Sequence, residues 1–323
     1  MGVRGQVLVP LCGIGSSKSG NLLPHSQNPI PGWTIWRAGG NLHRLIMWKI
    51  SRRKKLLATP LSPEWQRIVE TQCAFYHRLP VADRAELAGH VQVFLAEKKF
   101  EGCGGLVITE AMRVVIAAHA CLLLLHRQTD YYPQLQTILV YPGSYVVPVT
   151  RHVGGGIWEE GWQSRSGESW QTGAIVLAWE EVSREARNSQ PDNVVLHEFA
   201  HQLDYEDGGT ADGIPALGHG ESFALRQERY AAWTRVMRAE YEQLRARLSA
   251  GEPTFLRAYG ATNPPEFFAV ATESFFGDAA EMQRQHPALY AELKWFYRQD
   301  PAGWGGGLTT DEHGLHRLRT SKI

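Results

Sequence analysis

The sequence lacks acidic residues over its first 63 positions, and the first one is Glu64. Nine lysines and arginines lie in that stretch. The remaining positions, 64 to 323, therefore hold 24 basic and 33 acidic residues and carry a net charge of −9. A protein that binds nucleic acid needs a basic face for the phosphates. The acidic body argues against nucleic acid as the main partner.

Cysteine is also scarce, and no two of the four cysteines have the CxxC spacing of a zinc ribbon. They are Cys12, Cys73, Cys103 and Cys121. Such a low density excludes a disulfide framework and is typical of a reducing compartment. We therefore predict a cytoplasmic protein in which these cysteines are small core residues.

Long apolar runs are missing as well. The longest runs from Val114 to Leu125, is interrupted by His119, and is well short of the ~20 residues of a membrane span. The apolar start of the chain is broken by Pro10 and has no small-x-small cleavage site. The sequence thus predicts no membrane partner, and the long run predicts a buried helix capped by Thr109.

The order of local patterns predicts one helix-rich domain, residues 47–301. Residues 1–46 are rich in Gly, Pro, Ser and Asn and have no periodic face, so we predict that they are disordered or an over-extended reading frame, with Met47 as the start. Residues 60–130 read as the helical N-terminal part and residues 135–301 as the catalytic part. The tail, 302–323, is predicted to be flexible.

Within these parts, short β-branched runs predict strands and capping residues predict helix starts. The predicted strands are 136–142, 144–149 and 173–179, with a twisted loop or hairpin over 150–172. The predicted helices include one after Ser62, one from about Asp192 to Gly208, one from 222 to 249, one from Asn263 to Gly277, and one after Pro287. Together they predict an α+β fold with a small twisted sheet.

Residues 197–201 have the sequence HEFAH, which is an HExxH motif. On a helix, His197 and His201 lie one turn apart on one face and can direct both imidazoles at one tetrahedral metal ion. Glu198 lies about 100° round the helix, where it can take a proton from water instead of binding the metal. Alternatively, these are two exposed histidines on a helix whose apolar face lies elsewhere.

A catalytic zinc site usually has a third protein ligand, and the sequence offers several candidates. The metzincin spacing would need Gly at 204 and His at 207, but Asp occupies both positions. Asp212 lies in a Gly-rich loop, where aspartate usually forms a turn. Glu266, in a downstream helix, would give the gluzincin arrangement, although it could instead close a capping box with Asn263. Glu273 shares its face and is a rival ligand or an orienting partner.

Several segments together resemble the Mlc titration factor A family of bacterial zinc peptidases. These segments are VVLHEFAHQLD, SGESWQTGAIVLAW, ILVYP and AYGATNPPEFFAVATESFF, and the resemblance runs from about Trp65 to Pro301. The resemblance implies a zincin-like gluzincin fold, similar to the lethal-factor-like metallopeptidases. It also implies aminopeptidase-type activity, a cytosolic location and binding to the glucose-responsive repressor Mlc.

Residue by residue, the resemblance implies that His197, His201 and Glu266 bind one Zn²⁺ per chain and that Glu198 is the general base. It places Tyr259 near the metal, where its phenol could donate to the oxyanion of a peptide substrate. We further predict Asp204 as a carboxylate that orients an imidazole, strand 173–179 as a sheet edge that pairs with substrate, and a monomer.

Two other functions fit the same residues. The first is a regulatory binding protein that sequesters a transcription factor, with a structural or weakly active zinc site. A fourth protein ligand would favour that function, whereas an open position favours the peptidase. The second is a metallohydrolase that acts on non-peptide amides.

Overall fold

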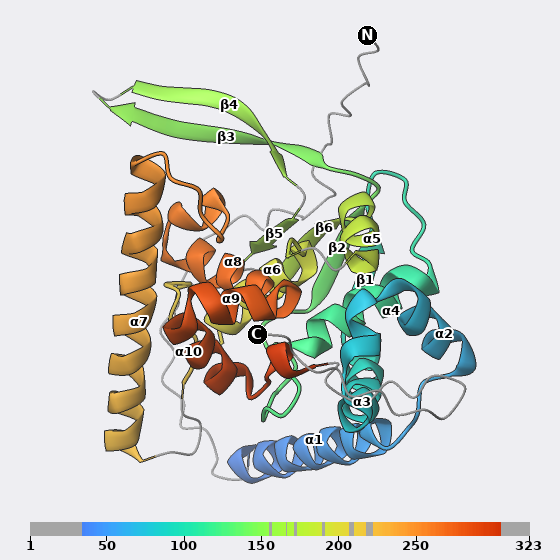
Figure 1. The fold of residues 1–323 in the computed structure, drawn as a ribbon. Helices are drawn as coiled ribbons and strands as arrows, with labels where there is room; N and C mark the ends of the chain where they lie inside the picture. The colour runs from blue at the N-terminus through green and yellow to red at the C-terminus, as the bar shows by residue number, and fades with distance from the viewer. Residues whose placement is uncertain are drawn as a thin grey trace, which may run out of the picture.

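The computed structural model describes residues 34–154, 157–165, 167–170, 173–188, 191–206, 210–217 and 222–304. Its α-helices are α1 Thr34–Leu57, α2 Pro63–Gln72, α3 Val81–Glu97, α4 Glu110–Leu122, α5 Trp179–Arg187, α6 Val194–Asp204, α7 Phe223–Ser249, α8 Pro264–Gly277, α9 Ala279–Gln285 and α10 Pro287–Tyr297. Its strands are β1 Lys99–Gly102, β2 Thr137–Tyr141, β3 Tyr145–Gly154, β4 Ile157–Arg165, β5 Gly167–Trp170 and β6 Ala174–Ala178. The predicted helix-rich α+β fold is confirmed (Figure 1).

The central sheet has the strand order β1-β2-β6-β5. Strands β1, β2 and β6 are parallel, and β5 runs antiparallel to β6. The predicted strands 136–142 and 173–179 are confirmed as β2 and β6. The prediction that β6 forms a sheet edge is wrong, because β6 lies between β2 and β5. Its unbroken apolar sequence is typical of an interior parallel strand that is buried on both faces.

The segment predicted as a loop or hairpin is largely the hairpin of β3 and β4, which pair antiparallel from Tyr145↔Arg165 to Gly154↔Ile157. Figure 1 shows the hairpin reaching away from the central sheet, above α7. Strand β1 and the helices α5 and α9 have no counterpart in the predicted order. Strand β1 reads KFEG and is mostly exposed, so it has neither the apolar alternation nor the length that marks a strand in sequence.

Helix α1 corrects the prediction for the N-terminal region. Residues 34–46, which the composition predicts as disordered, are helical and continuous with residues 47–57. The corresponding prediction for residues 1–33 and the predicted flexible tail from 305 onward lie outside the described residues. None of the described helices combines the length and the apolarity that crossing a bilayer requires.

Caps predicted from sequence begin several helices. Ser62 accepts a hydrogen bond from Trp65 N at the start of α2, and Asn263 accepts one from Glu266 N at the start of α8. The buried apolar residues from Val69 to Tyr297 form one cluster, which joins the predicted helical and catalytic parts. Because this core holds α6, α8 and the sheet together, the functional residues below are on rigid elements.

One core residue gives the fold a predicted pH dependence. His119 on α4 is buried, its Nδ1 donates to Val115 O at 2.9 Å, and its ring lies edge-on to Phe75. Burial lowers the pKa of His119 to about 4. The unfolded chain takes up this proton below its ordinary pKa near 6.5, whereas the folded chain stays neutral until about pH 4. The contribution of His119 to the free energy of unfolding is therefore complete above pH 6.5, and it falls as the pH drops towards 4.

We expect acidification from pH 7 to pH 4 to lower the free energy of unfolding by up to about 3 kcal/mol through the His119 group alone. The measurement is urea unfolding at a series of pH values with a chelator present. His119→Gln should be less stable at pH 7 but should lose less stability on acidification, because glutamine does not titrate. Equal pH slopes for the two proteins would contradict the assignment.

Candidate metal centre

The HExxH motif lies on helix α6. Its N-cap is Asn193, whose Oδ1 accepts from Leu196 N at 3.0 Å, and not Asp192 as predicted. The helix ends at Asp204, short of the predicted end near Gly208. The expectation of one apolar face with the histidines on an exposed side is also wrong, since every residue from Val195 to Asp204 is buried. The reason is tertiary: α6 contacts α4, α5, α8, β5 and β6.

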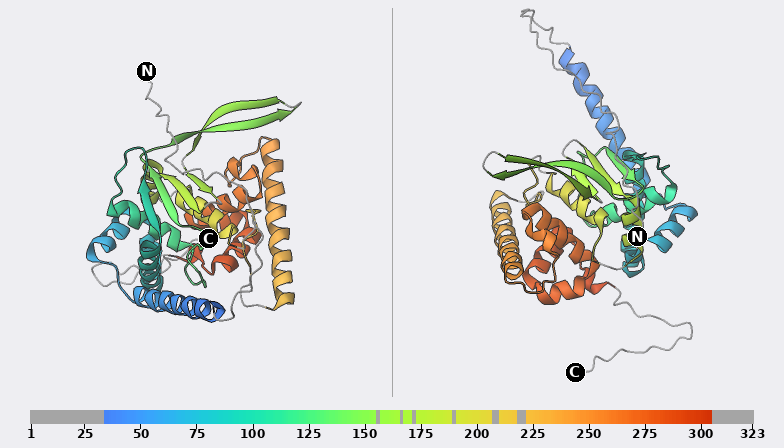
Figure 2. Two further views of the ribbon diagram at one scale, coloured as in Figure 1. Left: turned by 180° about the vertical axis from the view of Figure 1, so that it is seen from behind. Right: turned by 90° about the horizontal axis from the view of Figure 1, so that it is seen from above.

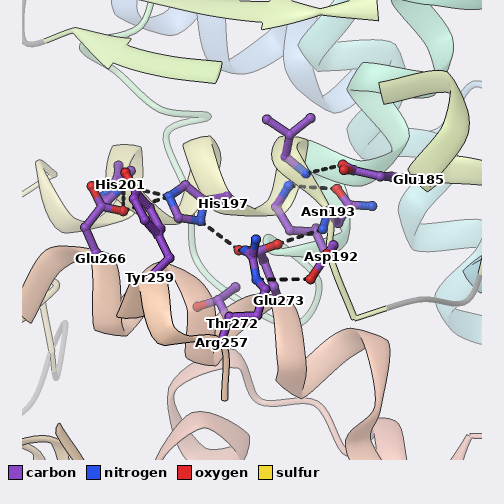
Figure 3. A network of polar contacts seen from close by, with 12 residues as sticks. Glu185, Asp192, Asn193, His197, His201, Arg257, Tyr259, Glu266, Thr272 and Glu273 are labelled. Carbon is purple, nitrogen blue, oxygen red and sulfur yellow. Dashed lines mark hydrogen bonds and ion pairs between the residues drawn. The ribbon is translucent and has the colours of Figure 1, made fainter. Parts of the chain in front are cut away.

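Three side chains from two helices meet at one point. His197 and His201 come from α6 and Glu266 from the first turn of α8, and together they form a group able to hold a metal ion (Figure 3). His197 Nε2 lies 2.9 Å from Glu266 Oε2 and 3.3 Å from His201 Nε2. His201 Nε2 lies 3.5 Å from Glu266 Oε2. The structure therefore brings together two histidines and a glutamate that lies 69 residues from His197 in the sequence.

The donor set and its spacing fit a divalent cation. Imidazole nitrogen and carboxylate oxygen bind zinc at about 2.0–2.2 Å, so two ligands of a tetrahedral ion lie roughly 3.3–3.6 Å apart. The separations of 3.3 Å and 3.5 Å agree with that value, and the shorter 2.9 Å contact is a hydrogen bond. Among the described residues, no fourth His, Cys, Asp or Glu joins the group. This leaves room for water or substrate at the fourth position of an ion.

Glu273 on α8 orients the first of these histidines. His197 Nδ1 donates to Glu273 Oε1 at 2.7 Å, which leaves Nε2 to face Glu266 and His201. The buried Glu273 also accepts from Asn193 N at 2.7 Å and from the Arg257 guanidinium. Arg257 in turn pairs with Asp192 at 3.0 Å (Figure 3). Of the two roles predicted for Glu273, the geometry matches the orienting partner, and Arg257 is a member that the sequence did not reveal.

This geometry predicts the effect of Glu273→Gln. A neutral amide can still accept one hydrogen bond, but its NH₂ group would face donors of Asn193 or Arg257, so His197 would lose its fixed orientation. Removing such an outer partner typically costs 10–100-fold in metal affinity. We expect a loss of that size in zinc affinity, measured by chelator competition. Glu281→Gln, which alters only the surface contacts of that carboxylate with Arg284 and Gln285, is the matched control and should bind zinc like the unmodified chain.

Glu266 had a structural alternative, that of closing a capping box with Asn263. One half of that box forms, because Asn263 Oδ1 accepts from Glu266 N at 2.9 Å. The Glu266 carboxylate, however, points to His197 and His201 (Figure 3). Asn263 thus begins the helix in the register that directs Glu266 towards α6.

Charges in the cluster favour a cation. Burial opposes a charge on His197, but its hydrogen bonds to Glu266 and Glu273 and the nearby charge of Glu198 raise the pKa of its imidazole to about 10. Burial likewise opposes the charge of Glu266, yet the hydrogen bonds with His197 and His201 hold the pKa of its carboxyl well below the ordinary value. A buried site of this kind attracts positive charge, whether as a proton or as a metal ion.

Glu198 and Tyr259 lie near the group formed by His197, His201 and Glu266. Glu198 is buried on α6 and close enough for its charge to act on the His197 imidazole. Tyr259 lies in the 3₁₀ turn Ala258–Ala261, with its ring centroid 5.9 Å from that of His197. Its side chain is 49% exposed, so it borders the site from the solvent side. An acidic group and a phenol thus lie near His197, and their roles in catalysis stay predictions.

Asp204 is predicted to orient an imidazole, but its carboxylate hydrogen-bonds to the backbone of a loop instead. Its Oδ2 accepts from Gly213 N at 2.8 Å, and burial raises the pKa of its carboxyl to about 6. Gly213 has φ +81°, and a Cβ there would lie 2.7 Å from Pro264 O. Asp204 therefore ties the loop 210–217 against the start of α8. Asp212, the other candidate ligand, accepts from Ile214 N and is outside the metal group.

Two histidines and a glutamate held by two packed helices thus form a group that could hold a metal ion. The family model described as glucose-regulated metallo-peptidase M90 matches residues 47–298. An uncharacterized protein of Synechocystis sp. is 41% identical over 256 residues, which cover 79% of this chain and 90% of that protein. Mlc titration factor A of Yersinia pestis is 28% identical over 270 residues, 83% of this chain and 90% of its own length, and the Yersinia pseudotuberculosis protein gives the same values.

The chain belongs to the glucose-regulated metallo-peptidase M90 family. The resemblance to the Mlc titration factor A family is confirmed by these relatives. Membership in a metallopeptidase family implies a metal ion, and His197, His201 and Glu266 are the residues that would hold it.

Proposed function

We propose that this chain is a zinc-dependent peptidase with its active site at the junction of α6 and α8. The observation that carries the proposal is the meeting of His197 Nε2, His201 Nε2 and Glu266 Oε2 beside the buried Glu198. When bound, zinc would supply Lewis acidity, which polarises a peptide carbonyl and acidifies water.

The chain's own residues would then carry the proton and the developing charge. Glu198 takes a proton from the attacking water and delivers it to the leaving amine, which is general acid–base catalysis. Tyr259 borders the site from the solvent side and donates its phenolic hydrogen bond to the carbonyl oxygen as it becomes negative. Glu273 keeps Nδ1 of His197 as a donor, so that Nε2 stays available as a ligand.

The proposed activity is of the aminopeptidase type, and this part rests on the family resemblance. It is tested with amino-acid anilides that have a free amino group and with the same anilides after N-acetylation. Cleavage of the free forms only would support an aminopeptidase, and cleavage of the acetylated forms would show an endopeptidase. A zinc-loaded chain that cleaves neither set, nor a broad panel of longer peptides, would contradict the peptidase proposal.

We also propose that the chain binds a transcriptional repressor of the Mlc type. The support is the name of the Yersinia relatives, Mlc titration factor A. A zinc-loaded chain without peptidase activity that nevertheless binds such a repressor would favour the alternative of a regulatory binding protein. In the part of the chain that the structure describes, no fourth protein ligand joins the group and Asp204 is held by Gly213, which supports the enzyme.

A further inference from the structure

Helix α1 presents a row of apolar side chains to solvent. Met47, Ile50 and Leu57 lie on one face of the helix, because with Lys54 between them the spacings are three or four residues. Met47 is 51%, Ile50 54% and Leu57 43% exposed. Large side chains of this kind scattered singly on a surface are ordinary, but here three follow one line along one helix.

A second row lies next to the first and is basic. Arg44, Trp48 and Lys55 are four and seven residues apart, and all three are exposed. Trp48 is 61% exposed, with the Arg52 guanidinium 5.5 Å from its ring. Helix α1 contains no acidic residue. Its outward side thus combines apolar side chains, a tryptophan and several cations without any compensating negative charge.

The exposure of these rows is imposed by how α1 is attached. Beside the apolar row, three residues from Ile50 and four from Leu57, Arg53 makes two hydrogen bonds to Glu97, Nε to Oε1 at 2.7 Å and Nη2 to Oε2 at 2.6 Å. Its guanidinium also lies 4.7 Å from the Tyr131 ring centroid, and Lys49 pairs with Asp130. This two-pronged ion pair fixes the rotation of α1 against α3, so the apolar row cannot turn inwards.

Helix α1 packs against α3 near its C-terminal end and otherwise projects from the fold. In the right-hand view of Figure 2 it extends from α3 outward, beyond the rest of the described fold. Its exposed face is therefore accessible to an extended flat surface, which a helix recessed among its neighbours could not touch.

We propose that the outward face of α1 binds the surface of an anionic lipid bilayer and lies in the plane of the interface. A basic helix with an apolar row and a tryptophan is the kind of helix that adsorbs to anionic lipid, and adsorption does not need the apolar length of a span. The absence of a span, from which the sequence predicts no membrane partner, does not bear on this mode of binding. Positions 64 to 323 are net acidic, so repulsion from the lipid would leave α1 as the contact.

The test uses the full chain in sedimentation with vesicles of pure phosphatidylcholine and with vesicles that contain phosphatidylglycerol as well. Each basic side chain near an anionic leaflet strengthens binding about fivefold, so Lys54→Glu with Lys55→Glu should weaken binding by at least about 25-fold. Trp48→Ser with Ile50→Ser should weaken it through the lost apolar contact. Higher salt should weaken binding of the unmodified chain.

Matched controls are on helix α7. Arg235→Glu with Arg238→Glu makes the same change of charge on another exposed helix, and Phe223→Ser with Leu225→Ser removes two other exposed apolar side chains. We expect both control proteins to bind anionic vesicles like the unmodified chain and all variants to unfold at the same temperature. Failure of the unmodified chain to bind anionic vesicles, equal losses in the α7 controls, or binding of α1 to an acidic protein but not to lipid would each overturn the proposal.

Discussion

Replacing Glu198 by glutamine is expected to lower kcat by about 10²–10⁴-fold while one zinc ion per chain stays bound. That range is the usual contribution of a positioned general acid–base group. Glutamine has nearly the shape of glutamate, so the buried environment of α6 should tolerate it. It cannot accept a proton from water, however, and Glu198 is not among the three residues that could hold the metal ion. The measurement is anilide hydrolysis together with the zinc content of the purified protein.

The control for this prediction is Glu228→Gln, an identical chemical change at an exposed position of α7. It should leave both activity and zinc content unchanged. If the Glu198 variant keeps the activity of the unmodified chain, Glu198 is not the base. If it loses zinc as well as activity, the change has disturbed the metal group, and the result does not support a role in proton transfer.

A second large effect is expected for Glu266→Gln, which should lose both zinc and activity. One of three protein ligands would become a neutral amide, so the zinc affinity should fall by more than the 10–100-fold that is typical for an outer partner such as Glu273. Chelator competition measures the affinity, and hydrolysis at saturating zinc measures any activity that remains. Zinc affinity equal to that of the unmodified chain would show that Glu266 is not a ligand.

Asn263→Ala separates the two possible roles of this helix start. It removes the cap that accepts from Glu266 N but leaves the Glu266 carboxylate in place. Loss of a cap typically costs about 1 kcal/mol of stability. We expect this variant to unfold more readily and still to bind zinc. If instead it loses zinc as completely as Glu266→Gln, the cap and not the carboxylate governs the site.

The residues of the metal group could be predicted because their signals are local. A spacing of four residues places His197 and His201 on one face of any helix, whatever surrounds it. Asn263 followed by two prolines marks the start of α8 and puts Glu266 in its first turn. The position of Glu266 on its helix favours it as third ligand over Glu273 and Asp212, and the family resemblance favours it more strongly.

Other features depend on partners that no local pattern specifies. Glu273 lies 76 residues from His197 in sequence, and Arg257 joins it from a third segment. Asp204 has the helical spacing to contact an imidazole, but its carboxylate instead accepts a hydrogen bond from the backbone N–H of Gly213 in the loop. Strand β6 was predicted as an edge because its own sequence does not show that β5 folds back to cover it.

The sequence by itself determined the pair of histidines, the adjacent glutamate and the starts of the helices, because helical periodicity and capping act within a few residues. Only the tertiary structure decided that α6 is buried on all sides, that Glu266 points to the histidines and not to its own helix start, and that Arg257 and Glu273 orient His197. These are contacts between segments far apart in the chain. They form where burial and hydrogen bonding of the whole core are best satisfied, which no single segment encodes.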